Sequence, residues 1–177
     1  AVDHALTKTD RLIVLSSQKD MKAEAPSPDE IFATGTVAMI MRMRKLPDGR
    51  IKILVQGLSK ARIKSFTQEA PFFTCKIEKV NDVQVEEGNV AADAMMRTVR
   101  EQLEKVINMG KVLSPDILMI LEDIKDAGRL ADLVASNLNL HVNEAQSILE
   151  ILDPIERLHK INAILERELE IISMQNK

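Results

Sequence analysis

The sequence contains very few aromatic residues and only one cysteine. Of its 177 residues 2% are aromatic, all of them phenylalanine, and neither tryptophan nor tyrosine occurs. Any hydrophobic core must therefore be built mainly from aliphatic side chains and methionine. Because Cys75 is alone, an internal disulfide and a metal site made from a cysteine cluster are both excluded. This cysteine usage is typical of a reducing cytoplasm.

Long hydrophobic runs and a strong net charge are also missing. No apolar stretch reaches the roughly 20 residues that a membrane helix needs, so no membrane partner is expected. Residues 1–10 have neither the basic start nor the apolar centre of a signal peptide. The net charge of −3 does not by itself indicate nucleic acid or membrane as a partner. The chain length suits one domain or two small ones.

The clearest pattern in the chain begins at Val37. From residue 37 to 44 two sets of side chains alternate with the period of two that is typical of a β-strand. Leu46-Pro47-Asp48-Gly49 then favours a tight turn, because proline fixes φ and glycine accepts a positive φ. The alternation resumes over residues 50–56, which predicts a β-hairpin. Gly57 predicts a bulge or bend before the strand continues over residues 61–65.

Other β signals flank this hairpin. Residues 11–17 and 72–80 are rich in strand-forming side chains. Ser27-Pro28-Asp29-Glu30 fits a capping box and predicts a single helical turn. We assign residues 1–80 to an antiparallel β domain, a partly open barrel-like sheet, and residues 81–89 to a linker.

From Val90 the apolar period changes to that of a helix. Caps and breakers predict about five helices. The first ends at Gly110, and the second is capped by Ser114-Pro115-Asp116 and followed by a stop or bend at Gly128. The third covers about 129–138, the fourth covers 143–151, and a long last helix follows Asp153-Pro154. Their short connections predict a compact bundle over residues 90–177. The fold class is therefore α+β, a β domain followed by a helical bundle.

Five stretches resemble the N-terminal region of the Lon family of ATP-dependent proteases (endopeptidase La). They are Gly35-Thr36-Val37-Ala38, the Leu46–Gly49 turn, Val55-x-Gly57-Leu58-x-x-x-Arg62-Ile63, Leu130-Ala131-Asp132, and Gln146 to Leu158. Together they span nearly the whole chain. In that family a strand region with a Phe-Pro-Gly motif precedes the short helix expected near residue 5. We therefore expect that the first strand is missing here and that the β domain has an open edge.

The resemblance implies a non-catalytic role. The region would engage misfolded, damaged and short-lived regulatory proteins, and it would support a ring-shaped homo-oligomer, expected to be a hexamer. The whole protein would be an ATP-dependent AAA+ serine protease involved in protein quality control and the stress response. ATP, Mg²⁺ and the proteolytic serine–lysine pair would belong to segments further along, so no cofactor is expected in this chain. The bacterial cytoplasm is the expected location, in preference to the mitochondrial matrix.

No residue pattern predicts catalysis or metal binding. Ser59 follows Gly57-Leu58 as in a nucleophile elbow, but the closing glycine is absent, and we interpret it as part of a strand connection. The same stretch also lacks the first glycine of a phosphate-binding loop. Glu156 and His159 form half of a di-iron motif without a second copy, so we interpret His159 as a surface residue. Cys75 is interpreted as a small buried apolar group. We predict no catalytic, cofactor-binding or metal-ligating residues.

Two sets of side chains are candidates for binding. Methionine is unbranched and polarizable, so an exposed methionine stripe accepts many apolar partners; the alternative is that the stripe packs into the β core. The candidate substrate-binding residues are Met39, Met41, Met43, Leu46, Phe72 and Phe73. The second set is basic and would attract DNA phosphates or acidic peptides. It comprises Arg42, Arg44, Lys45, Arg50, Lys52, Lys60, Arg62 and Lys64.

Two other functions stay open. No aromatic residue lies among the basic positions to stack on bases, and alternation places many of them on a solvated sheet face, so DNA is the less favoured partner. DNA binding would require a steep salt dependence. A stand-alone adaptor with the same β domain, as in some ubiquitin-ligase receptors, is the other alternative. The helical half argues against it, because that half also resembles the protease family.

Overall fold

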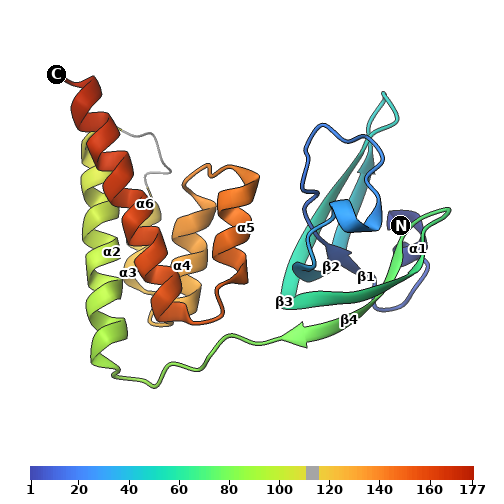
Figure 1. The fold of residues 1–177 in the computed structure, drawn as a ribbon, viewed down its shortest axis with the longest axis horizontal. Coiled ribbons are helices and arrows are strands. Elements are labelled where there is room, and N and C mark those ends of the chain that lie inside the picture. The colour runs from blue at the N-terminus through green and yellow to red at the C-terminus, as the bar shows by residue number, and fades with distance from the viewer. Residues whose placement is uncertain (111–115) are drawn as a thin grey trace. The chain divides into compact units, whose positions relative to one another are not determined.

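The computed structural model describes residues 1–110 and 116–177. These residues form two compact units, Ala1–Asn81 and Asp82–Lys177. The first unit carries one antiparallel sheet and the second is built from helices (Figure 1). The fold class is α+β, as the sequence predicted. The boundary follows Asn81, so residues 82–89 of the predicted linker, residues 81–89, belong to the helical unit.

The sheet unit has four strands in the order in which they occur in the chain, each antiparallel to the next. The strands are β1 (Leu12–Leu15), β2 (Thr34–Lys45), β3 (Ile51–Gln68) and β4 (Thr74–Val80). A short helix, α1 (Val2–Leu6), precedes β1, and a 3₁₀ turn, η1 (Pro28–Glu30), precedes β2. β3 has 18 residues and forms one hairpin with β2 and a second hairpin with β4.

Local turn chemistry shapes the connections as predicted. The Leu46 N–H donates to the Arg50 carbonyl at 2.8 Å, and the Gly49 N–H donates to the Leu46 carbonyl at 3.0 Å. Gly49 has a φ of 87°, a value that favours glycine. In η1 the Ser27 N–H donates to Glu30 Oε1 at 3.2 Å, which satisfies an otherwise free backbone donor.

Two bulges interrupt the pairing of β2 with β3. One lies at Leu58, beside Gly57, where the sequence predicted a bulge or bend. The other lies at Met41, because the residues on either side of it, Ile40 and Arg42, pair with consecutive residues of β3. Since side chains alternate along a strand, each bulge shifts the alternation by one residue.

The buried part of the sheet unit is small. Ala38, Ile40 and Ala61 are at most 1% exposed, and Ala5 of α1 is 5% exposed. Among the described residues of this unit, Ile40 is the one large side chain that is fully buried. Small residues at these positions allow close approach of neighbouring chain segments but bury little apolar area.

The helical unit contains five helices in its described part. They are α2 (Val90–Asn108), α3 (Ile117–Glu122), α4 (Ala127–Ser136), α5 (Val142–Glu150) and α6 (Pro154–Gln175). Side chains of Asn89, Asp126 and Asp153 cap the first turns of α2, α4 and α6. The core is aliphatic apart from methionine, and Val99, Leu103, Leu158 and Ile161 are fully buried in it. No helix in residues 1–110 or 116–177 has an apolar stretch that could cross a bilayer.

The sequence predicted the ends of the first helices from three caps and breakers. Gly128 was predicted to stop or bend a helix, but this was wrong, because it lies in the first turn of α4. Ser114 and Pro115, predicted to cap the second helix, lie outside the described residues, and α3 begins after Asp116. Gly110 follows the end of α2 with a φ of 106°, in agreement with its predicted role.

Candidate functional site

The methionines of β2 do not share one face of the sheet. Met43 pairs with Ile53, whereas Met39 pairs with Gln56. Ile53 and Gln56 are three residues apart in β3 and therefore point to opposite faces. The predicted stripe assumed uninterrupted alternation, and the bulge at Met41 breaks it.

Burial separates the three methionines as well. Met41 is 45% exposed, while Met39 and Met43 are half-buried. The fully buried side chains of this part of β2 are those of Ala38 and Ile40, which alternate with the methionines. Met41 is therefore a surface residue and not part of the β core.

The remaining candidates of the apolar set lie elsewhere in the unit. Leu46 is in the turn between β2 and β3, and Phe72 and Phe73 are in the connection between β3 and β4, which follows the other end of β3. The Phe72 ring centroid is 5.0 Å from that of His4, and Phe73 packs edge-to-face on Phe66 at 5.3 Å. The six predicted residues are thus not brought together in one cluster.

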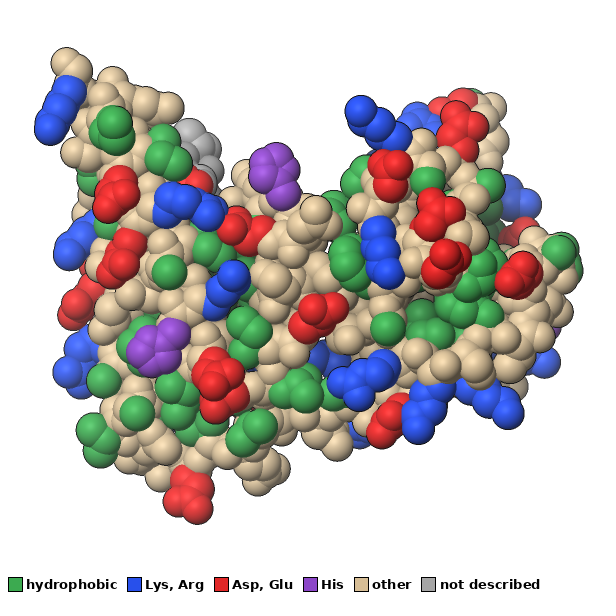
Figure 2. Space-filling model, viewed as in Figure 1, with side chains coloured by type: hydrophobic (Ala, Val, Ile, Leu, Met, Phe, Trp, Pro, Cys, Tyr) green, Lys and Arg blue, Asp and Glu red, His purple; other side chains and the backbone are tan. Residues whose placement is uncertain are grey.

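Sequence reasoning missed the apolar side chains that β3 exposes. Leu54 is 60% exposed, Leu58 is 51% exposed and Ile51 is 41% exposed. Leu58 is the residue left unpaired by the bulge beside Gly57. The signal in the sequence was the run Ile53-Leu54-Val55, which does not alternate with polar residues. Together with Met41, these three residues are called the exposed hairpin residues below. Figure 2 shows apolar side chains among charged ones at the surface.

The basic set is also divided by the pairing. Arg50 forms an ion pair with Asp48 at 2.6 Å, and Lys64 forms one with Glu78 at 3.3 Å. Arg62 lies directly opposite Glu78 in the ladder. These three cations therefore have acidic neighbours that weaken their attraction for phosphate.

Three of the other cations lie on one face of the hairpin. Arg44 pairs with Lys52, and Arg42 lies two residues before Arg44 in β2. Lys45 points to the opposite face, where it pairs with Ile51. Lys60 lies further along β3, opposite Thr36 of β2 and Val80 of β4. The pairing thus places Arg42, Arg44 and Lys52 of the predicted basic patch in one smaller group.

The residues that could have suggested an enzyme sit in ordinary structural positions. Ser59 pairs with Val37 in the ladder between β2 and β3. Glu156 and His159 are exposed on α6. In the described part of the chain no group of three or more His, Cys, Asp or Glu side chains is placed to hold a metal ion.

Cys75 lies in β4 and is partly buried. Burial raises the pKa of its thiol, so less thiolate is present at neutral pH than in an unfolded chain. We predict that iodoacetamide alkylates Cys75 several-fold more slowly in the folded chain than in urea. Mass spectrometry of quenched samples measures both rates, and equal rates would contradict the burial.

Arg157 is a buried charged residue that sequence reasoning missed. It lies in α6 with 0% of its surface exposed. Its two terminal nitrogens donate to the two carboxylate oxygens of Asp82 at 3.0 and 2.8 Å. Nη1 also donates to the Ile151 carbonyl at 2.7 Å, and Nε lies 3.2 Å from Asp132 Oδ1. One feature of the sequence indicated this burial: Arg157 stands four residues before Ile161 and therefore lies on the apolar stripe of α6.

The charge of Arg157 is retained despite this burial. Burial by itself would lower the pKa of the guanidinium. The hydrogen bonds that Arg157 donates to Asp82, and the negative charges of Asp132, Asp82 and Asp126, outweigh that effect, so the pKa of Arg157 lies above its ordinary value. The lack of a side chain at Gly128 makes room for the group, since a Cβ there would lie 2.9 Å from Arg157 Nη2.

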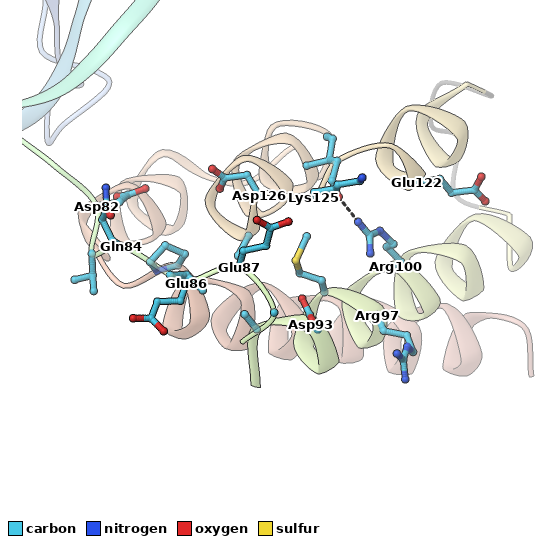
Figure 3. A pocket seen from close by; sticks show the side chains of 18 residues that line it. Asp82, Gln84, Glu86, Glu87, Asp93, Arg97, Arg100, Glu122, Lys125 and Asp126 are labelled. Atoms are coloured by element: carbon cyan, nitrogen blue, oxygen red, sulfur yellow. Dashed lines mark hydrogen bonds between the residues drawn. The ribbon is translucent and has the colours of Figure 1, made fainter. Parts of the chain in front are cut away.

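A cavity of about 1000 Å³ lies beside this cluster, within the helical unit (Figure 3). It is open to solvent and is lined mainly by residues 82–88, the first half of α2 and the connection between α3 and α4. Arg100 donates from Nε to the Leu121 carbonyl at 3.1 Å and from Nη2 to the Ile124 carbonyl. Arg100 therefore holds the α3–α4 connection in place and is not free to bind a ligand. Among the charged residues that line the cavity, acidic ones outnumber basic ones: the acidic residues are Asp82, Glu86, Glu87, Asp93, Glu122 and Asp126, and the basic ones are Arg97, Arg100 and Lys125.

A family model described as the ATP-dependent protease La (LON) substrate-binding domain matches residues 1–167. The chain belongs to this Lon family. Lon protease 2 of Bdellovibrio bacteriovorus is 51% identical over 177 residues, which are 100% of this chain and 22% of that protein. Lon protease of Trichlorobacter lovleyi is 56% identical over 176 residues, which are 99% of this chain and 21% of that protein. The resemblance seen in the sequence is thereby confirmed.

The fold agrees with Lon N-terminal domains of known structure. The N-terminal domain of the Mycobacterium avium complex Lon protease superposes with a TM-score of 0.71, covering 94% of this chain and 83% of that domain, at 16% identity. The chain spans about a fifth of the length of the Lon relatives that it matches. The family matched is a substrate-binding domain and not a catalytic one, in agreement with the sequence prediction.

Proposed function

We propose that the sheet unit of this Lon-type domain binds apolar segments of misfolded, damaged and short-lived regulatory proteins. The observation that carries this proposal is the set of exposed hairpin residues, Met41, Ile51, Leu54 and Leu58, each more than 40% exposed. Large apolar side chains in water gain free energy when a partner covers them. The polypeptides that offer such partners are those whose own apolar residues are not buried.

The arrangement of these residues suits weak and unselective binding. Ile51 and Leu54 are three residues apart in β3 and point to opposite faces, so no single deep pocket gathers them. Ordering a flexible polypeptide also costs entropy that a few contacts do not fully offset. Several copies held together raise the effective concentration of such sites. A ring-shaped homo-hexamer of the whole protein in the bacterial cytoplasm, with ATP and Mg²⁺ bound outside this chain, belongs to the same proposal.

The test replaces two exposed hairpin residues at once, in the variant Met41→Ala/Leu54→Ala. The probe is reduced and carboxymethylated α-lactalbumin, which stays unfolded without denaturant. We expect its affinity to fall several-fold, while the free energy of unfolding changes by no more than about 0.5 kcal/mol, as at other surface positions. Fluorescence anisotropy of the labelled probe and chemical denaturation measure the two quantities.

The matched control is Met119→Ala, which truncates a methionine that is 69% exposed on α3 of the helical unit. Its affinity for the probe should equal that of the unchanged chain. Unchanged binding by the hairpin variant, or an equal loss in the control, would show that the hairpin is not the binding surface.

DNA binding is the less supported proposal. Its support is the group of Arg42, Arg44 and Lys52 on one face of the hairpin. Phosphate contacts of this kind weaken steeply with added salt, whereas apolar contacts do not. The salt dependence of binding distinguishes the two proposals.

A further inference from the structure

The chain that joins the two units is fastened to the helical unit almost as soon as it leaves the sheet. β4 ends at Val80 and the boundary follows Asn81. Asp82, the next residue, accepts two hydrogen bonds from Arg157, and the Val83 N–H donates to the Leu152 carbonyl at 2.8 Å. The first attachment is made to α6, and the second to the connection between α5 and α6.

The anchor on the helical side does not depend on Asp82. Arg157 is also held by the Ile151 carbonyl at 2.7 Å and by Asp132 at 3.2 Å. A guanidinium held in this way presents a fixed fork, which is the geometry that binds a carboxylate through two parallel hydrogen bonds. Asp82 therefore docks onto a site that the bundle already provides.

The residues that follow Asp82 have fewer attachments. Residues 81–86 form neither helix nor strand, and α2 starts after its cap Asn89. Val83 is 55% exposed, whereas Val85 packs against the core. Among the described residues, the Asp82–Arg157 pair is a charged attachment of this segment, and the Val83 backbone hydrogen bond and the packing of Val85 accompany it.

We propose that the Asp82–Arg157 pair is a clamp that sets the length of free chain between the two units. When the clamp is closed, the free chain is limited to the residues around Asn81. When it opens, residues 82–88 join the free chain and add a reach of up to about 23 Å at full extension. A longer linker lowers the effective concentration of one unit near the other. The clamp therefore controls how far the sheet unit ranges from the helical bundle.

The test compares Asp82→Ala with Asp132→Ala. Both variants remove one carboxylate from the same guanidinium, but only Asp82 belongs to the joining segment. Spin labels at Gln56→Cys in β3 and Met174→Cys in α6, both exposed positions, report the distance between the units in a Cys75→Ser background. We expect Asp82→Ala to broaden the distance distribution and Asp132→Ala to leave it unchanged.

Hydrogen exchange supplies a second measurement on the segment itself. In Asp82→Ala the Val83 amide should exchange roughly 10- to 100-fold faster, the factor that corresponds to losing hydrogen bonds to a charged group. In Asp132→Ala its rate should stay near that of the unchanged chain. The proposed clamp would be contradicted if Asp82→Ala changed neither the exchange rate nor the distance distribution. It would also be contradicted if both variants changed these quantities equally.

A disulfide distinguishes release of the segment from damage to the bundle. Val83→Cys and Leu152→Cys place two thiols on residues whose backbones are hydrogen-bonded to each other. Oxidation of this pair in the Asp82→Ala chain, in the Cys75→Ser background and without spin labels, should return amide exchange of residues 84–88 to the rate of the unchanged chain, and reduction should raise it again. Exchange that stays fast after oxidation would overturn the proposal, also where Asp82→Ala alone lowers the helix content.

Discussion

Arg157→Ala is expected to lower the free energy of unfolding of the helical unit by about 3–5 kcal/mol, the usual cost of breaking a buried ion pair by removing one partner. The substitution removes a fully buried side chain and leaves the Ile151 carbonyl without this donor. It also leaves the carboxylates of Asp82 and Asp132 without their shared cation. These side chains are 31% and 56% exposed, so water reaches them and the loss should lie near the lower end of the range.

The control for this prediction is Arg167→Ala on the same helix. Arg167 forms two hydrogen bonds with Glu144 at 3.0 and 2.8 Å, but its side chain is 51% exposed. Exposed ion pairs contribute little to stability, so the control should lose far less than Arg157→Ala. Urea denaturation followed by circular dichroism measures both variants. Similar losses in the two would show that burial of the pair is not what makes Arg157 important.

Gly35→Ala is expected to detach β1 from β2. A Cβ at Gly35 would lie 2.4 Å from the Leu15 carbonyl oxygen and 3.1 Å from Ser16 Cβ. The first of these contacts is with backbone, which cannot turn aside as a side chain can. Overpacking typically costs about 1–3 kcal/mol, and we expect a loss at the upper end because two strands must separate. Faster amide exchange in β1 should accompany the lower stability.

Gly57→Ala is the matched control in β3. There the nearest atom to a new Cβ is Thr36 Cγ2 at 3.6 Å, which is an ordinary van der Waals contact. Stability should therefore change little at this position. If both glycines tolerate alanine, then β1 does not lie as close to β2 as its pairing indicates, and thermal denaturation of the two variants decides this.

The parts of the fold that depend on local chemistry could be predicted from the sequence. Leu46-Pro47-Asp48-Gly49 closes its hairpin because proline and glycine constrain that backbone directly. Asp153-Pro154 likewise starts α6, where the aspartate side chain accepts from the Ile155 N–H at 2.9 Å. In both places the interacting groups lie within a few residues of one another.

The features that depend on distant partners could not be predicted. The bulge at Met41 has no glycine or proline to signal it, and it moved Met43 to the face opposite Met39. Arg157 stands out on the apolar stripe of its helix, but its partner Asp82 lies 75 residues earlier. Many acidic residues could have served as that partner, and only the fold selects one. The candidate surface predicted from the sequence therefore stays a prediction, and the pairing shows only that its methionines do not share one face of the hairpin.

The aliphatic core of the helical unit also determines how the chain can be observed. All four phenylalanines, Phe32, Phe66, Phe72 and Phe73, belong to the sheet unit, whereas most of the helix lies in the other unit. Near-ultraviolet circular dichroism from aromatic rings therefore reports on the sheet unit, and the helical band in the far ultraviolet reports mainly on the bundle. Loss of structure in the two units can be followed separately in one sample. Because the chain has no tryptophan, the fluorescence of a tryptophan in a bound polypeptide is seen without background from the domain.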